Sequence, residues 1–314
     1  MNPRYALAVL AVTAAASEAA LAAPALAAEA QPAPAPAPKP GPKADDIEEV
    51  ADVTDISKVS SWSADSWGDP AQFPANERGI NLLTTRTVPK WHGSIIVDHR
   101  ANEAISEKPF DDFLGLDAGS LKIGLGLRLG LLDSLDVGIY RLNGTSEPFD
   151  TYELDARWRL LDQERHFVSA AVRAGGTWFY IPNGADDAGV FGQLMVERLF
   201  ARRVLWSLSL LYHSNSTSDM KNARDTRWSL AVGTLLDVRL ARFMAWEIEA
   251  VPAVAGFADA HPSYSTALKF ITNRHTFSII VSTSQLTAAD GVVANTSRNV
   301  EKCVIGFKIV RELP

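Results

Sequence analysis

The 314-residue sequence carries 30 Lys and Arg against 37 Asp and Glu, which gives a formal net charge of −7. With 20 Gly and 8 Trp, this composition suits neither a nucleic-acid-binding protein nor a disordered chain. The single cysteine, Cys303, excludes a disulfide within the chain, and the absence of a Cys-x-x-Cys-His motif excludes covalently attached haem. No cofactor is expected.

The N-terminus predicts a secretory signal peptide over residues 1–27. Arg4 supplies the positive start, residues 5–16 form an uncharged Ala/Leu/Val run, and Ala25–Ala27 offers small residues around a cleavage point. The alternative is a membrane anchor, but the run is short for one and a processing site follows it. The mature chain is therefore expected to begin near Ala28.

Residues 28–78 are expected to form a mostly unstructured periplasmic extension. Pro and Ala nearly alternate over residues 31–43, which keeps a chain extended. Apolar residues then recur at every third position among Asp and Glu, a spacing that drifts around a helix without making a sustained stripe. This part could fold into a barrel lumen as a plug, dock a periplasmic protein, or be an acidic linker. The recurring residues are Ile47, Val50, Val53, Ile56, Val59 and Trp62.

The clearest strand signal covers residues 120–131. Every odd position from Leu121 to Leu131 is Leu or Ile, and every even position is Ser, Lys, Gly or Arg. A period of two places the apolar side chains on one face of a strand. The other face carries Lys122, Arg128 and three glycines, a poor lining for a sandwich core. An apolar exterior with a polar interior is typical of a transmembrane β-barrel.

Residues 79–314 contain twelve segments with strand signals. Short links follow the even-numbered segments except the last, whereas the links after odd-numbered segments are usually longer. This alternation is typical of outer-membrane barrels, whose short turns face the periplasm. We therefore predict an all-β, antiparallel, up-and-down barrel of about 12 strands with both termini in the periplasm. The segments are 91–100, 120–132, 135–142, 150–161, 166–180, 188–199, 204–213, 226–237, 243–252, 263–272, 275–284 and 299–310.

A soluble β-sandwich is the alternative fold, since it also has many short strands. It does not explain the alternation of loop lengths, and it accounts poorly for Trp and Tyr on the apolar faces. These residues prefer a membrane interface, where one end is apolar and the other is wet. They are Tyr152, Trp158, Trp178, Trp206, Tyr212, Trp228, Trp246 and Tyr264.

The opposite faces of the strands supply charged residues to the predicted lumen, nine basic and seven acidic. Neither sign dominates, as it would in a strongly ion-selective pore. Such a wall either fills a narrow lumen with ion pairs or lines a narrow solute path. The basic residues are Lys122, Arg128, Arg157, Arg159, Arg173, Arg227, Lys269, Lys302 and Lys308; the acidic residues are Asp98, Asp136, Glu153, Asp155, Glu197, Glu247 and Glu249.

One segment has the character of a motif and carries a resemblance. Phe110, Asp111, Asp112, Phe113, Gly115 and Asp117 lie in the sequence Phe-Asp-Asp-Phe-Leu-Gly-Leu-Asp. The chain resembles an uncharacterised bacterial outer-membrane-type β-barrel family with this segment after the first strand. Weaker similarities at 152–161 and 275–284 extend the resemblance from about Ile80 to Arg311. Because the family has no established activity, it implies only fold and location.

No metal site or enzyme activity is expected. Asp111, Asp112 and Asp117 could bind Ca²⁺, but three carboxylates are too few, and they also suit the first turn of a loop helix. No His pairs closely with another His or Cys in the sequence, so a zinc site is not indicated. The adjacent His213 and Ser214 would point to opposite sides of a strand, which excludes a catalytic pair between them.

We expect a narrow channel or passive transport component of a Gram-negative outer membrane. The alternative is a structural, anchoring barrel with a filled lumen that docks a periplasmic or surface partner. Expected partners are outer-membrane lipid, the barrel assembly machinery and a periplasmic protein bound through residues 28–78, with no nucleic acid. Assembly signals often use an aromatic residue in the last strand, where this chain offers Phe307 before its Leu313-Pro314 end.

Overall fold

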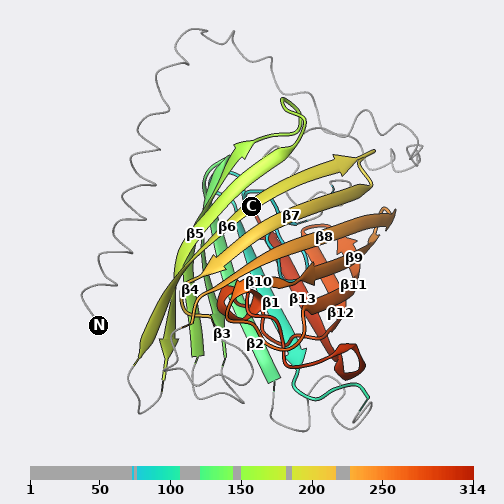
Figure 1. The fold of residues 1–314 in the computed structure, drawn as a ribbon. Helices are drawn as coiled ribbons and strands as arrows, with labels where there is room; N and C mark the ends of the chain where they lie inside the picture. Colours follow the sequence, from blue (N-terminus) through green and yellow to red (C-terminus); the bar gives the residue numbers. More distant parts are fainter. Residues whose placement is uncertain (1–72, 74–75, 107–120, 144–149, 182–185, 217–226) are drawn as a thin grey trace, which may run out of the picture.

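The computed structural model describes residues 73, 76–106, 121–143, 150–181, 186–216 and 227–314 (Figure 1). Its strands form one antiparallel sheet that closes on itself. The strands are β1 (Gly93–Ala101), β2 (Leu121–Leu132), β3 (Leu135–Leu142), β4 (Asp150–Leu161), β5 (Ser169–Tyr180), β6 (Asp187–Phe200), β7 (Val204–His213), β8 (Ser229–Ala241), β9 (Met244–Val251), β10 (Ala253–Gly256), β11 (Ser263–Thr272), β12 (His275–Ser282) and β13 (Val304–Leu313).

Apart from β10, each strand pairs with the one before and after it along the sheet, β9 pairs with β11, and β13 pairs with β1 to close the barrel. β9 and β10 both pair with β8 and are two pieces of one strand, separated by Pro252. Proline lacks the N–H that a sheet ladder needs, so it marks the interruption. The closed barrel therefore has twelve strands, and the predicted fold class is confirmed.

The last strand was predicted too early, at 299–310. Asn299 instead caps a short 3-10 helix, η5 (Val300–Lys302), by accepting a hydrogen bond from the Glu301 amide. The sheet resumes only at Val304, and β13 then runs to Leu313. The composition could not show this turn, because Val300 is apolar like the residues of the strand although its side chain is exposed.

The alternation in β2 separates an outer from an inner face. Leu125 and Leu127 are each 48% exposed, whereas Lys122 and Arg128 are only 2% and 5% exposed. The glycines of this strand provide space inside the barrel. A Cβ atom on Gly124 would lie 1.8 Å from the Tyr140 hydroxyl, so the ring of Tyr140 occupies the space that a larger residue would fill.

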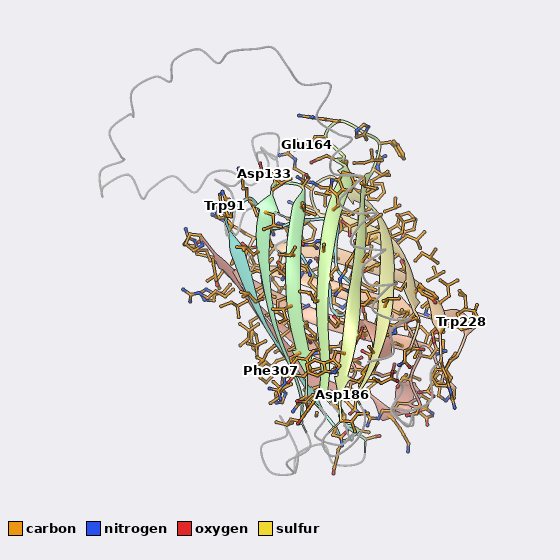
Figure 2. The ribbon with its side chains drawn as sticks, turned by 90° about the vertical axis from the view of Figure 1, so that its left-hand side faces the viewer. Trp91, Asp133, Glu164, Asp186, Trp228 and Phe307 are labelled. Atoms are coloured by element: carbon orange, nitrogen blue, oxygen red, sulfur yellow. The ribbon has the colours of Figure 1, made fainter. Side chains whose placement is uncertain are left out.

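Exposed aromatic residues form two bands, one near each end of the barrel. We call the end with the tight turns the short-turn end, where Trp91, Asp133 and Glu164 lie, and the opposite end, with Asp186, the long-loop end (Figure 2). Aromatic rings of this kind favour the two interfaces of a bilayer. The short-turn band contains Trp91, Phe167, Phe200, Trp206, Phe243, Trp246 and Phe277, and the long-loop band contains Trp178, Tyr180, Tyr212, Trp228 and Tyr264.

Helix is scarce in the described ranges, where α2 (Ala289–Val292) and η5 both lie between β12 and β13. Among these residues, no helix has both the length and the apolar composition needed to cross a bilayer.

Candidate functional site in the barrel lumen

The chain before β1 folds back into the barrel. Residues 76–90, which we call the inner hairpin, form a tight turn in which the Gly79 amide donates to the Leu82 carbonyl oxygen at 2.8 Å. A bridge between Arg78 and Leu83 continues the hairpin. Both of its ends lie at the short-turn end, where the Asn76 amide group donates to Thr276 and the Thr87 hydroxyl donates to the Asp133 carbonyl. The inner hairpin therefore enters the lumen and returns through the same opening.

Two charged wall residues bind the tip of the inner hairpin through its backbone. The carboxylate of Glu249, on β9, accepts hydrogen bonds from the Asn81 and Leu82 amides at 3.0 Å each and from the Asn81 side chain at 2.8 Å. Lys308, on β13, donates to the carbonyl oxygens of Gly79 and Ile80. Buried peptide groups need such partners, and bonds to charged groups are the stronger ones.

The wall also binds the two arms of the inner hairpin. One guanidinium nitrogen of Arg157, on β4, donates to the Glu77 and Thr84 carbonyls at 3.0 and 2.9 Å. The carboxylate of Asp136, on β3, accepts from the Val88 amide at 2.8 Å. Two further contacts join hairpin side chains to the wall, between Thr85 and Glu197 at 2.7 Å and between Arg86 and Glu312 at 3.2 Å.

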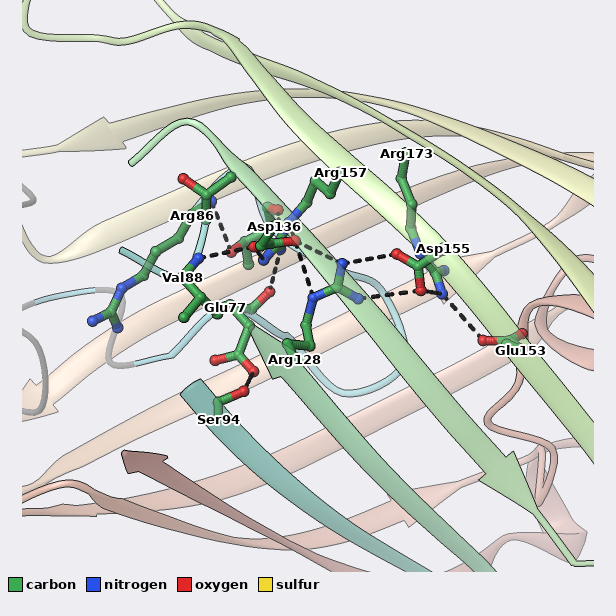
Figure 3. A network of polar contacts seen from close by, with 12 residues as sticks. Glu77, Arg86, Val88, Ser94, Arg128, Asp136, Glu153, Asp155, Arg157 and Arg173 are labelled. Atoms are coloured by element: carbon green, nitrogen blue, oxygen red, sulfur yellow. Dashed lines mark hydrogen bonds and ion pairs between the residues drawn. The ribbon is translucent and has the colours of Figure 1, made fainter. Parts of the chain in front are cut away.

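Arg157 and Asp136 begin a chain of alternating charges across β2–β5, which we call the charge ladder (Figure 3). Arg128 contacts Asp136 at 2.7 Å and Asp155 at 2.8 Å. Arg173 contacts Asp155 at 2.9 Å and Glu153 at 3.1 Å. Three arginines thus face three carboxylates, and this balance is what allows so many charges to be buried together. The ladder consists of Arg157, Asp136, Arg128, Asp155, Arg173 and Glu153.

A second buried cluster lies on β8, β9 and β11. The Lys269 ammonium contacts Asp237 at 3.0 Å and Glu247 at 2.6 Å, and all three side chains are at most 1% exposed. Glu247 lies two residues before Glu249 on β9, so this cluster lies beside the tip of the inner hairpin. The wall is therefore charged on both sides of the hairpin.

The connection from β12 to β13 fills the other half of the lumen. We call residues 283–299 the outer loop. Leu286 and Ala288 pack against Tyr140 and Leu142 of β3. The Ala289 amide donates to Glu153, so the charge ladder ends on this loop.

The inner hairpin and the outer loop meet inside the barrel. Arg78 donates to the Thr287 carbonyl at 2.7 Å. Leu82 belongs to the same buried apolar cluster as Val292 and Val293, together with wall residues that include Leu235. Within the residues described, the lumen is therefore occupied by two segments of the chain that touch each other.

The structure buries thirteen of the sixteen charged side chains that the sequence assigns to the lumen. Arg159 lies nearer the opening, with its side chain 14% exposed and 3.5 Å from Asp162. Arg227 and Lys302, also assigned to the wall, are exposed because they lie outside the strands. The buried residues are Asp98, Lys122, Arg128, Asp136, Glu153, Asp155, Arg157, Arg173, Glu197, Glu247, Glu249, Lys269 and Lys308.

Two further sequence predictions concern a loop motif and a weak metal site. The motif from Phe110 to Asp117, including the weak Ca²⁺ candidates Asp111, Asp112 and Asp117, lies outside the described residues. In the part that is described, no group of three His, Cys, Asp or Glu side chains is arranged to hold a metal ion.

Sequence reasoning missed the inner hairpin. Residues 80–90 precede the first predicted strand segment, 91–100, and the predicted boundary between residues 78 and 79 falls inside the hairpin. The available signal was the mixture of Glu77, Arg78 and Arg86 with apolar residues that follow neither a helical nor a strand period.

An apolar outer face between two aromatic bands, around a polar interior, defines a transmembrane β-barrel. Residues 75–313 match the family described as "Membrane bound beta barrel domain (DUF5777)", and the chain belongs to this family. No curated protein matches the sequence.

Two solved structures show limited similarity. The NanC porin has 10% sequence identity and a TM-score of 0.43, with 71% of this chain and 99% of that chain covered. OprB of Pseudomonas putida has 11% identity and a TM-score of 0.25, with 63% of this chain and 60% of that chain covered. These values are too low to transfer either protein's properties to this chain.

Proposed function

We propose that the protein is an outer-membrane barrel of a Gram-negative bacterium that forms a narrow channel, closed at rest by the inner hairpin. Its short-turn end faces the periplasm in this proposal, with both termini on that side. The observation that carries it is the set of charged wall side chains that bind the hairpin through its backbone. Arg157, Asp136, Glu249 and Lys308 all make such bonds.

Water molecules can replace the hairpin peptide groups that these wall side chains bind. A carboxylate or guanidinium that loses a peptide group in an open lumen becomes hydrated, because water offers similar donors and acceptors. The lumen would then be polar and charged on both sides, which suits passage of water and small solutes. Its balanced signs predict weak preference between anions and cations.

The second candidate function is that of an anchor with a permanently filled lumen. It is favoured by Phe73, which packs against Leu205, Ala245 and Ile271 at the short-turn end. This contact ties the chain that precedes the inner hairpin to the barrel. Residues 28–78 would then hold a periplasmic partner at the membrane.

Conductance of the full chain in planar bilayers separates the two functions. We expect the unmodified protein to be silent apart from rare openings, and the double variant Glu249→Gln/Lys308→Met to open often, because it removes the two charges at the hairpin tip. The matched control is Arg141→Gln/Asp150→Asn, which removes an ion pair from the outer face. Heat-modified electrophoretic mobility checks that each variant is folded.

The outcomes distinguish the candidates. Frequent opening of the tip variant alone supports a closed channel. Silence of all three folded proteins supports the anchor. Steady conductance by the unmodified protein would overturn closure by the inner hairpin.

A further inference from the structure

The short-turn end of the barrel carries an excess of basic side chains. Four of the five tight turns contain at least one arginine, and others flank them on β6 and β13. Six of the eight basic side chains are exposed and two are half-buried, whereas the acidic side chains exposed or half-buried there are Asp133, Asp162 and Glu164. We call this set the basic rim: Lys90, Arg165, Arg198, Arg202, Arg203, Arg242, Arg274 and Arg311.

Aromatic contacts fix the level of the basic rim relative to the bilayer. The Arg198 guanidinium lies 3.6 Å from the centre of the Phe167 ring and 5.4 Å from that of Phe200. The Lys90 ammonium lies 5.8 Å from the centre of the Trp91 ring. Phe167 and Trp91 are 76% and 69% exposed and belong to the short-turn aromatic band. Because such bands sit at headgroup depth, the cations beside them do as well.

The two residues of the rim that lie on strands face outward from the barrel. Arg198 and Arg311 alternate with the inward residues Glu197 and Glu312, so their side chains leave the sheet on the lipid side. Arg311 contacts the His275 ring at 2.9 Å along this face. These cations are therefore separate from the lumen charges that bind the inner hairpin.

The long-loop end lacks this excess among the residues described there. Four basic side chains face six acidic ones, and the two signs are interspersed. The basic residues are Arg141, Arg227, Arg298 and Lys302, and the acidic residues are Glu103, Asp150, Asp186, Asp187, Asp259 and Glu301. Among the described residues, the excess of basic side chains is thus confined to the short-turn end.

We propose that the basic rim binds the phosphate headgroups of anionic phospholipids in the leaflet at the short-turn end. A guanidinium can donate two parallel hydrogen bonds to a phosphate, and the rim spaces several of them around the barrel. Basic residues at headgroup level are attracted to an anionic surface over about 10 Å at moderate salt. This interaction does not depend on whether the lumen conducts.

Lipid retention by the purified full chain tests the proposal. Native mass spectrometry from detergent would compare phosphatidylglycerol with phosphatidylcholine at equal mole fraction, with and without added salt. The test variant is Arg203→Gln/Arg242→Gln/Arg274→Gln, which changes only turn residues. The matched control is Arg141→Gln/Arg227→Gln/Lys302→Gln, which removes three charges from the long-loop end.

We expect the unmodified protein to prefer phosphatidylglycerol and the test variant to lose at least about tenfold of this preference at low salt. The control should retain it, and added salt should reduce it in the unmodified protein. Equal loss in both variants, or no preference in the unmodified protein, would overturn the proposal. Unchanged heat-modified mobility ensures that a loss in the test variant does not reflect unfolding.

Discussion

The two segments that occupy the lumen are held by different kinds of wall contact. The inner hairpin presents peptide groups to charged wall residues such as Glu249 and Arg157. The outer loop inserts a group of apolar side chains, with Leu286 against β3 and Val292 and Val293 in the cluster that includes Leu235. The wall therefore holds the backbone of the inner hairpin with charged side chains, whereas apolar contacts anchor the outer loop and also include Leu82 of the hairpin. The difference predicts that each segment can be loosened without the other.

The largest effect is expected from Arg157→Met. This change leaves Asp136 without one of its arginines and frees two hairpin carbonyls inside the barrel. Breaking a buried ion pair by removing one partner costs about 3–5 kcal/mol of unfolding free energy. Urea unfolding in lipid vesicles measures the loss, and Arg242→Met, on an exposed turn, is the control. Equal stability of the two variants would contradict a central role for the charge ladder.

A smaller loss of unfolding free energy, about 2–3 kcal/mol, is expected from Leu286→Ala, because truncation of a buried leucine leaves a cavity. Hydrogen exchange should quicken in the outer loop and stay unchanged at the Asn81 amide. An equal increase in hydrogen exchange in both segments would show that they form one cooperative unit, which contradicts the prediction that each can be loosened without the other.

Glu249→Gln should have the opposite effect on hydrogen exchange and lower the free energy of unfolding by about 2 kcal/mol. Hydrogen bonds to a charged acceptor lose strength when the acceptor becomes neutral. The Asn81 and Leu82 amides should exchange faster, whereas those of α2 should not. Glu164→Gln, on an exposed turn, serves as the control, and protection unchanged by Glu249→Gln would rule out its role at the hairpin tip.

The smallest effect is expected from Arg141→Gln. The ion pair of Arg141 with Asp150 lies on the outer face, and the arginine side chain is 47% exposed. Exposed pairs contribute about 0.5 kcal/mol or less. A loss as large as that of Arg157→Met would show that burial does not decide the strength of these pairs.

The sheet was predictable because its signal is local. Each strand alternates its own apolar and polar residues, and β2 does so without interruption from Leu121 to Leu131. The prediction failed where a local signal was misleading, as at Val300, or where one residue interrupts a strand, as at Pro252. Strand count and closure therefore followed from pattern, whereas the ends of individual strands did not.

The inner hairpin was not predictable in the same way. Its conformation depends on partners far away in the sequence: Asn81 and Glu249 are 168 positions apart. The sequence showed that the wall carries mixed charges and left a plug before the barrel as one alternative, but it did not show that residues 76–90 would occupy the lumen. Such a fit becomes visible only when the strands are placed around it.

The closure of the barrel by its last strand has a consequence for the order of assembly. β13 pairs with β1 and also carries Lys308 and Glu312, which bind the inner hairpin. The first described segment of the chain thus obtains part of its binding site from the last. A barrel that lacks its final strand would have both an open seam and an incompletely bound hairpin. The pairing of β13 with β1 therefore closes the barrel wall and completes the binding site of the inner hairpin in the same step.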